Sequence, residues 1–516
     1  MKKHINKILT LVNNYFVGNS TEKLMFEFKG IIKYIPLIIC GGFFGFTVII
    51  FAFGPLDWKI NNEFELYSFL VSCIIALVFG YILAIKKGKT PNNELNLNTN
   101  NILLMCSIVF LILYIPTVFS RTGKFYPDFL TGLYNAGKAY KISYEYTLNG
   151  SKVVEYLRIV FSPFLIMIVP LTLFFMPKLS KKVKIVGLFV MVCMLILGIS
   201  QGINKISADF TSQIVLFFTL LLFSNYKKGF NIKFRLKILS TIILICALFF
   251  MYYSSTMVSR IEMDISKGTA PAVVLTPTDQ NGSIINEKTE ITTTIPETTI
   301  DSNLNPDVKP ETIDDSINNS VIKYALFGYA VEKENYYLLS LLPNRIRSTA
   351  LFLSSYVSHG YKGLSIAMSH KFTSSYGFGF SNFLTHNFLK IVGKENYESY
   401  IFKRTYVAKT SENGWVTGEV WSTFFVYPAS DITFFGTVLV VFLIGYLFGL
   451  SWKDTLITKN IFAVVVFFNF CMMIFYFSAN NQIFQSGETC VGFIVMIVLW
   501  FITRHFLTIN RHFTKE

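Results

Sequence analysis

Several common functional motifs are missing from the 516 residues of this chain. It has no glycine-rich phosphate-binding loop, no dinucleotide-binding fingerprint, no His-Glu-x-x-His sequence and no Cys-x-x-Cys pair. ATP-driven transporters and metalloproteases depend on such motifs, so the sequence argues against both classes. The seven cysteines all lie in or beside apolar segments, which indicates buried packing and not a disulfide framework or a zinc site.

Charged residues are also scarce. They make up 15% of the chain, whereas hydrophobic residues make up 52%. A soluble protein of this size could not bury so much apolar surface, so we infer that much of it faces lipid. The net charge of +15 comes from short Lys and Arg clusters between apolar segments and not from one basic and aromatic face. We therefore expect no nucleic acid partner.

Long apolar segments dominate the sequence. A helix needs about 20 mostly apolar residues to cross the hydrocarbon core, because its backbone polar groups must be satisfied within the segment. Ten segments meet this condition, near 31–53, 66–85, 101–120, 154–177, 183–200, 207–224, 236–256, 432–450, 460–478 and 488–507. The sequence therefore predicts an all-α polytopic membrane protein with ten transmembrane helices.

The distribution of Lys and Arg predicts the orientation. Loops rich in these residues alternate along the chain with loops that are poorer in them, and the rich loops are expected in the cytoplasm. Both termini are then cytoplasmic, and one large extracytoplasmic loop lies between spans 7 and 8. We expect four regions: an N-terminal membrane bundle at 1–256, a disordered periplasmic insert at 257–320, a folded periplasmic loop with amphipathic helices at 321–431 and a C-terminal membrane bundle at 432–516.

The folded outer loop contains an amphipathic segment from 350 to 368. Its apolar residues recur at spacings of three and four, which predicts a helix with one apolar face. At about 100° per residue, His359 lies opposite that face, and a helix of this kind could cover a cavity. A break near Gly360 is an alternative, since glycine weakens a helix by roughly 1 kcal/mol.

Two stretches of the sequence carry recognisable motifs. Residues 356–384 contain Gly-Tyr-x-Gly-Leu-Ser and then a Tyr-Gly-x-Gly turn, and residues 414–449 contain Trp-Ser-Thr and then Ser-Asp before an apolar span. These stretches resemble the oligosaccharide repeat-unit polymerases, which are the O-antigen and capsule polymerases of the Wzy type. A looser match is Glu155-Tyr-Leu-Arg158 at the start of the fourth span.

The resemblance implies a glycosyltransferase of the bacterial inner membrane. Such an enzyme moves a growing glycan from undecaprenyl diphosphate onto a new lipid-linked repeat unit at the outer face, and it needs neither a metal nor another cofactor. Its partners would be lipid-linked glycans, membrane lipids, a flippase and a chain-length regulator. The alternatives are an O-antigen ligase-type glycan transferase and a flippase for the same lipids.

Binding a diphosphate calls for arginine, because its planar guanidinium pairs with two phosphate oxygens and stays charged. Arg158, at the expected outer mouth of the fourth span, is the first candidate. Arg345, Arg347 and Arg404 lie in the outer loop and could bind the same group. For each of the four, the alternative is an ordinary interfacial or surface arginine.

Activating a sugar hydroxyl calls for a base. His359 and Glu419 are the candidate catalytic residues, since both lie in the outer loop in or beside the motifs. A structural histidine is the alternative for His359. Asp431 could bind the acceptor, or it could instead cap the helix of the eighth span.

Other residues could form the walls of the site. Tyr361 and Trp421 suit stacking on sugar rings, although they equally suit an aromatic belt at the membrane interface. Lys205 and Asp209, in the short outer loop between the fifth and sixth spans, could line the same cavity.

Overall fold

The structure, a computed structural model, describes residues 30–91, 94–95, 97–150, 152–223, 232–266, 330–333, 336–415 and 420–513. In this part of the chain the regular structure is helical, apart from one antiparallel pair of short strands, β1 (Leu56–Asp57) and β2 (Val331–Glu332). The prediction of a mainly α-helical membrane protein is confirmed. Most of the insert predicted at 257–320 lies outside the described residues.

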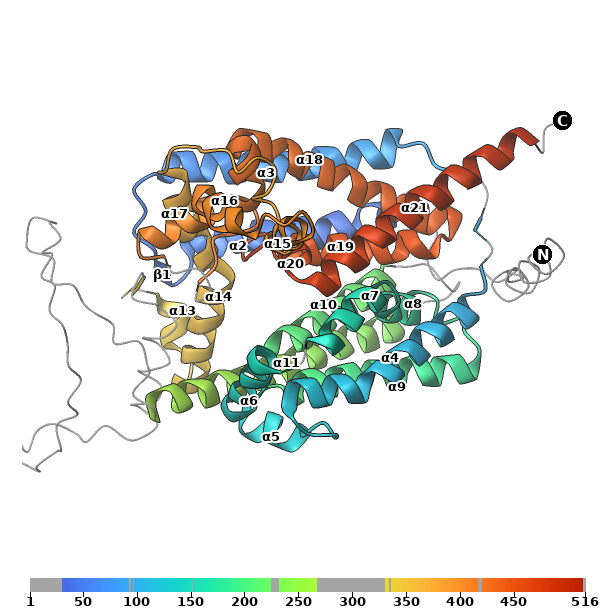
Figure 1. The fold of residues 1–516 in the computed structure, drawn as a ribbon, viewed down its shortest axis with the longest axis horizontal. Helices are drawn as coiled ribbons and strands as arrows, with labels where there is room; N and C mark the ends of the chain where they lie inside the picture. The colour runs from blue at the N-terminus through green and yellow to red at the C-terminus, as the bar shows by residue number, and fades with distance from the viewer. Residues whose placement is uncertain are drawn as a thin grey trace, which may run out of the picture.

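Nine helices of the described chain are long and apolar enough to cross a membrane. They are α2 (Ile35–Phe53), α3 (Glu63–Lys87), α4 (Thr99–Thr122), α7 (Val153–Leu165) continued by α8 (Ile168–Phe174), α9 (Lys181–Ser200), α10 (Asn204–Leu222), α11 (Ile232–Ser266), α18 (Val426–Thr458) and α21 (Gly487–Phe513) (Figure 1). Each corresponds to one predicted span. The seventh is longer than predicted, because α11 continues past residue 256 to Ser266.

The remaining predicted span, near 460–478, is a shorter helix. This helix, α19 (Ile461–Phe475), has 15 residues, nearly all of them buried among its neighbours. At 1.5 Å per residue it spans roughly 22 Å, which is less than the roughly 30 Å of a hydrocarbon core. By its length, α19 is therefore too short to cross the hydrocarbon core by itself.

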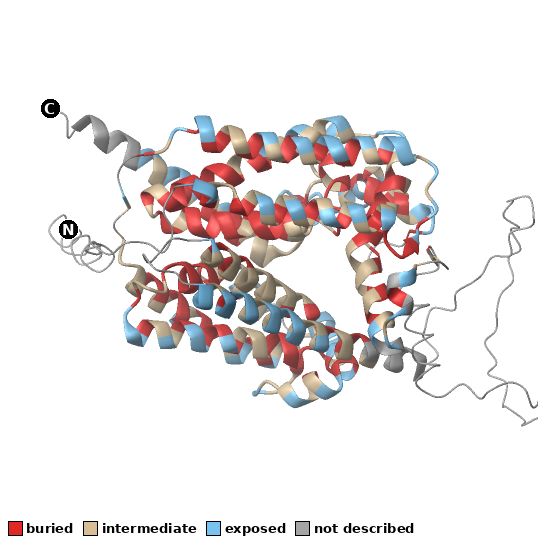
Figure 2. Ribbon diagram, turned by 180° about the vertical axis from the view of Figure 1, so that it is seen from behind, coloured by how far each residue is buried: buried red, intermediate tan, exposed pale blue. Residues whose placement is uncertain are grey.

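The helices form two groups, which Figure 1 shows one above the other. The first group contains α2, α3, α18, α19 and α21, and the second contains α4 to α11. We call the contact region between them the seam; α21 meets α7 there, and α19 meets α8 and α10. Figure 2 shows buried positions facing the interior of both groups and exposed positions on their outer faces.

Shorter elements gather at one end of the bundle. They are α5 (Phe129–Tyr134), α6 (Ala136–Asn149), α13 (Tyr337–Ser340), α15 (Asn382–Ile391), η2 (Glu395–Tyr397), α16 (Glu398–Arg404), α17 (Tyr406–Glu412) and α20 (Gln482–Gln485). Among them stands α14 (Asn344–Met368), whose Phe352 packs against Tyr253 of α11 and whose Tyr361 packs against Phe51 of α2. We call this the α14 end of the bundle.

The predicted amphipathic helix at 350–368 is confirmed, and it continues through Gly360 without a break. A glycine is needed there because a Cβ atom would collide with the carbonyl oxygen of Ser478, in the segment after α19. A Cβ atom at Gly363, about one turn further, would likewise collide with Trp415 Nε1 and Ser422 Oγ. The two glycines let α14 pack closely on both segments.

The other end of the bundle holds the start of η1 (Gly30–Lys33) and the last turns of α21. Trp452 Nε1 of α18 donates to the carbonyl of Ile32 at 3.1 Å, and Arg504 Nε of α21 donates to Asp454 Oδ2 of α18 at 2.8 Å. The start of the first described helix and the last turns of the final one therefore lie at the same end of the bundle. This agrees with an even number of crossings between them.

Glycines bring α3 and α18 into close contact. A Cβ at Gly80 of α3 would collide with the backbone of Phe442, and one at Gly445 of α18 would collide with the carbonyl of Leu77. Small residues allow membrane helices to approach closely, where van der Waals contacts replace the missing hydrophobic driving force. This packing fixes the long helices on which the α14 end is built.

The Gly445→Leu variant should therefore be destabilised. The added side chain must force α3 and α18 apart, which we expect to cost on the order of 3 kcal/mol. Thermal unfolding in detergent measures the loss. The matched control is Gly45→Leu in α2, where a Cβ would meet nothing within 4 Å. Equal melting temperatures for the two variants would contradict the packing argument.

Candidate functional site

A cavity of about 200 Å³ lies at the seam, lined by residues of both helix groups. Arg158, Lys205, Asp209 and Glu488 line one part of it, and mainly apolar side chains such as Leu165, Val169, Phe468 and Met472 line another, together with the amides of Gln213 and Asn469. The helices α7 and α10 run away from the α14 end, and their charged residues come before their apolar ones. The helix α19 runs toward the α14 end, and its apolar residues lie before the helix ends. The charged part is therefore the part nearer the α14 end.

An ion-pair network borders the charged part. Arg158 Nε donates to Glu488 Oε1 at 2.8 Å and Nη2 donates to Oε2 at 2.6 Å, so the pair is bidentate. Arg121 makes the same kind of pair with Glu155, at 2.9 and 2.7 Å, and its Nη2 also donates to Glu488 Oε1 at 3.1 Å. Glu488 thus joins both arginines across the seam.

Local helix geometry explains half of this network. Glu155 and Arg158 are three residues apart on α7 and therefore share a face of the helix. The side chains of Arg158 and Glu488 are only 12% and 22% exposed, so the ions are largely removed from water. Charges this deeply placed are costly unless they are paired, which accounts for the bidentate geometry.

Two further polar residues of the cavity come from α10. Lys205 and Asp209 are four residues apart and share a face, and both line the cavity beside Arg158 as the sequence suggested. Tyr476, the residue that follows α19, donates its hydroxyl proton to Asp209 Oδ1 at 2.6 Å. Lys205 makes no hydrogen bond or ion pair with any residue that the structure describes.

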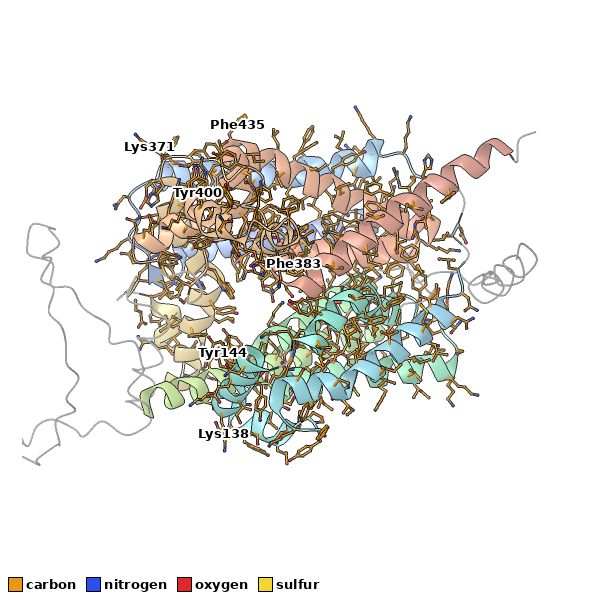
Figure 3. The ribbon with its side chains drawn as sticks, viewed as in Figure 1. Lys138, Tyr144, Lys371, Phe383, Tyr400 and Phe435 are labelled. Carbon is orange, nitrogen blue, oxygen red and sulfur yellow. The ribbon has the colours of Figure 1, made fainter. Side chains whose placement is uncertain are left out.

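Phe383 of α15 lies close in space to the neighbours of two charged residues of the cavity. It lies against Gly487 and beside Ile159, which are the neighbours of Glu488 and Arg158 in the sequence. Figure 3 shows Phe383 where α15 faces the seam. Neither α14 nor α15 contributes a residue to the lining of the cavity, so a cover formed by an outer-loop helix stays a prediction.

His359, the predicted base, has a structural position. It is 2% exposed; its Nδ1 lies 3.0 Å from the carbonyl oxygen of Ser355, and its Nε2 accepts the backbone N–H of Trp421 at 3.1 Å. Nδ1 must then carry the proton, which leaves no ring nitrogen to accept a proton from a sugar. The prediction of a polar, cavity-facing side for α14 is wrong because both faces of this helix are packed.

Burial also lowers the basicity of His359. Desolvation is the largest cause and lowers the pKa of the imidazole to about 4, against the smaller opposite effect of the hydrogen bond to Ser355. In the unfolded chain His359 has a pKa near 6.5 and binds a proton as the pH falls below that value, whereas in the folded chain it stays neutral until about pH 4. The stabilisation is therefore complete above about pH 6.5 and is lost as the pH falls toward 4.

We accordingly predict that the protein loses stability on mild acidification and that His359 causes part of the loss. For wild type, the denaturant concentration at the unfolding midpoint should decrease when the pH is lowered from 7 to 5. In His359→Asn the starting stability should be lower, because the contact to Trp421 changes, and the dependence on pH should be flatter. An unchanged slope between these pH values would contradict a neutral, buried His359.

The predicted stacking residues also have packing roles. Tyr361 is fully buried, its hydroxyl lies 2.7 Å from Thr47 Oγ1, and its ring packs edge-on against Phe51. Trp421 packs against Tyr356, with ring centroids 4.6 Å apart, and its carbonyl accepts the indole N–H of Trp415. The prediction that Tyr361 stacks on a sugar is therefore wrong.

Asp431 joins the two motif-bearing stretches. Its Oδ1 accepts hydrogen bonds from Ser375 Oγ, Gly377 N and Gly379 N at 2.5, 2.9 and 3.1 Å. It does not cap α18, which begins five residues earlier and kinks at Ile432 and Thr433. Asp431 instead holds the Tyr-Gly-x-Gly turn, in which Tyr376 and Gly377 both have positive φ angles.

The loop arginines do not reach the cavity. Arg347 pairs with Glu332 at 2.5 Å, and Arg404 donates to the carbonyl of Ser374 at 2.6 Å while its guanidinium lies 4.6 Å above the ring of Tyr376. Neither lines the cavity, so their predicted convergence with Arg158 is wrong. The side chain of Arg345 and the whole of Glu419 lie outside the described part of the structure.

Sequence reasoning missed three residues of this site: Arg121, Tyr476 and Glu488. Arg121 lies in the last turn of α4, and Glu488 lies in the first turn of α21. Ionisable residues inside a membrane span are rare and mark functional sites or buried pairs. That rule, applied to the span ends, would have found both charged residues.

Comparisons with known protein families, with curated proteins and with solved structures each find no match to this chain. Across the described ranges, no group of three or more His, Cys, Asp or Glu residues could hold a metal ion.

Proposed function

We propose that this chain is a glycosyltransferase that polymerises oligosaccharide repeat units carried on undecaprenyl diphosphate, for O-antigen or capsule, at the outer face of the bacterial inner membrane. The observation that carries the proposal is the cavity at the seam, where a charged part and an apolar part adjoin. A lipid diphosphate has the same two parts. The motifs that resemble repeat-unit polymerases favour this lipid and this reaction.

The charged part has the groups that a diphosphate requires. Arg121, Arg158 and Lys205 lie around Glu488, and guanidinium groups bind phosphate oxygens in the same bidentate geometry that they use for a carboxylate. Glu488 therefore occupies the place of an anion between the two arginines. In the proposed mechanism, the diphosphate of the donor replaces Glu488 as the partner of the arginines, and the cations stabilise the leaving group.

Three buried polar atoms lie close in the sequence to residues of the cavity wall, although none of them lines the cavity itself. They are Asn480 Oδ1, Asn481 Oδ1 and Gln485 Nε2, and none has a hydrogen-bond partner among the described residues. Buried polar groups are usually hydrogen-bonded. All three belong to the segment that joins α19 to α21, next to Gln482 and Glu488 of the cavity wall.

The proposal places the α14 end at the periplasmic face of the inner membrane. Loops at the opposite end contain the clusters Lys86, Lys87 and Lys89 and Lys181, Lys182 and Lys184, which the positive-inside rule assigns to the cytoplasm. Substrates would then arrive at the outer end through a flippase, and a chain-length regulator would act at the same face.

The proposal is tested with the full-length chain in liposomes. Lipid-linked repeat units are extracted from cells in which the gene for this chain is deleted, and they are added to the purified protein. We expect a ladder of lipid-linked products with two or more repeats. A ligase would give no ladder and would transfer glycan only to a different acceptor, and a flippase would move the lipid without joining units; either result would overturn the proposal.

A further inference from the structure

With His359 buried and both of its nitrogens engaged, the base of the proposed reaction is unassigned. We propose that Asp209 is that base: its carboxylate accepts the proton of the attacking sugar hydroxyl. This inference rests on the proposed function and deepens it, because it names the group that activates the acceptor.

The carboxylates near the cavity differ in what their oxygens contact. Glu488 has both oxygens bound to guanidinium groups, Glu155 has both bound to Arg121, and Asp431 holds the backbone turn away from the cavity. Asp209 lines the cavity, and only its Oδ1 accepts a hydrogen bond within the described residues. Because Oδ2 has no donor among the residues that the structure describes, it can accept a hydrogen bond from a substrate.

The neighbours of Asp209 place it correctly for this role. Lys205, on the same face of α10, and Arg158 line the same cavity and bind the leaving group in the proposed reaction. A base must lie within one sugar ring of the leaving group, because the attacking oxygen and the departing oxygen bind opposite sides of one carbon. One cavity of about 200 Å³ holds both groups.

Tyr476 acts as a positioning residue. Its hydroxyl donates to Oδ1 at 2.6 Å, which holds the carboxylate in place and leaves Oδ2 without a donor among the described residues. Tyr476 belongs to the first helix group and Asp209 to the second. The hydrogen bond therefore also ties the base to the segment that precedes α20.

The step balances as follows. Asp209 Oδ2 takes the proton from the acceptor hydroxyl while the acceptor oxygen forms a bond to the anomeric carbon of the donor glycan. The bond from that carbon to the diphosphate oxygen breaks, and its electron pair leaves with the lipid diphosphate, held by Arg158 and Lys205. The proton then passes from Asp209 to the released diphosphate, which restores the carboxylate.

The test is Asp209→Asn in the liposome assay with extracted lipid-linked repeat units. A base contributes about 10²- to 10⁴-fold, so we expect the turnover number to fall by at least about 100-fold while the Michaelis constant for the lipid-linked repeat changes by less than about threefold. Asp209→Glu should recover part of the rate, since it restores a carboxylate. Tyr476→Phe should give a smaller loss, about tenfold or less.

Binding is followed separately, by the thermal stabilisation that inorganic pyrophosphate gives. Asp209→Asn should keep this stabilisation, which shows that the fold and the anion site are intact. The matched control is Thr219→Val, on the same helix, where Thr219 bonds only to the carbonyl of Val215 at 2.8 Å in the structure. It should keep the wild-type rate.

Three results would overturn the assignment. The first is an Asp209→Asn variant with more than a tenth of the wild-type turnover number. The second is equal loss of turnover and of pyrophosphate stabilisation, which indicates a structural role. The third is a Glu488→Gln variant that binds pyrophosphate but does not turn over, which moves the base to Glu488. A wild-type protein that forms no product refutes the proposed function itself, and the assignment fails with it.

Discussion

Arg158→Ala should reduce the catalytic efficiency of glycan polymerisation by about 10²- to 10³-fold, the usual effect of removing one preorganised donor to a developing anion. In the structure this guanidinium makes a bidentate pair with Glu488, and in the proposed mechanism it makes the same pair with the donor diphosphate. Arg158→Lys should recover little, because an ammonium cannot form the planar double contact. The product ladder in liposomes measures both effects.

The contrasting variant is Arg347→Ala. Arg347 belongs to the predicted outer loop but pairs with Glu332 outside the cavity, so we expect its efficiency to stay within about threefold of wild type. Full activity of Arg158→Ala, or equal losses in the two variants, would remove the cavity at the seam from the mechanism. The comparison tests Arg158, which lines the cavity, against Arg347, which only the sequence suggested as a ligand of the diphosphate.

Glu488→Ala should be the most destabilising single change at the site. It leaves Arg121 and Arg158 largely buried beside each other without the carboxylate that joins them, and breaking such a pair costs about 3–5 kcal/mol. Thermal unfolding in detergent should show a large fall in melting temperature. Inorganic pyrophosphate should raise the melting temperature of Glu488→Ala more than that of wild type, because it replaces the missing anion.

Two controls accompany this prediction. Glu145→Ala removes an exposed glutamate that pairs with Lys141 at 3.6 Å, and it should change the melting temperature very little. The double variant Arg158→Ala with Glu488→Ala should be more stable than the sum of the single losses implies, since it removes both charges of one pair. Additive losses, or equal stabilisation by pyrophosphate in wild type and Glu488→Ala, would contradict the idea that Glu488 occupies an anion site.

The membrane helices could be predicted because lipid imposes one strong condition. Each span must satisfy its own backbone and present apolar side chains over about 20 residues, and both conditions are local in the sequence. The sixth span shows how far this extends. Asp209 and Gln213 weaken its apolar character, yet Asn204–Leu222 forms a single helix as expected.

The site could be predicted only in part, because its contacts are not local. Glu155 and Arg158 share a motif that the sequence shows, but the partner of Arg158 is 330 residues further along the chain. The pairing of Asp209 with Tyr476 spans 267 residues. No periodicity or spacing indicates such pairs, although the charge of each residue within an apolar span marks it as unusual.

The outer loop shows a second limit. The spacing of apolar residues in α14 correctly predicts a helix, but it says nothing of what covers the opposite face. His359 lies there against the backbone of Trp421, so a residue that seemed to face a cavity is part of a packed interior. By contrast, the Tyr-Gly-x-Gly and Ser-Asp motifs prove to be one structure, since Asp431 accepts the amides of both glycines.

The short length of α19 has an energetic consequence for any lipid that reacts here. The 15 residues of α19 are too few to cross a hydrocarbon core of roughly 30 Å, so in the proposed orientation Tyr476, directly after the helix, lies within the depth of the bilayer and not at its surface. A carrier lipid can then present its anionic end sideways while its hydrocarbon stays in the bilayer. Lifting that chain into water would cost about 0.8 kcal/mol for each methylene group. A site within the bilayer avoids this cost. The protein then has to stabilise only the charged diphosphate at that depth.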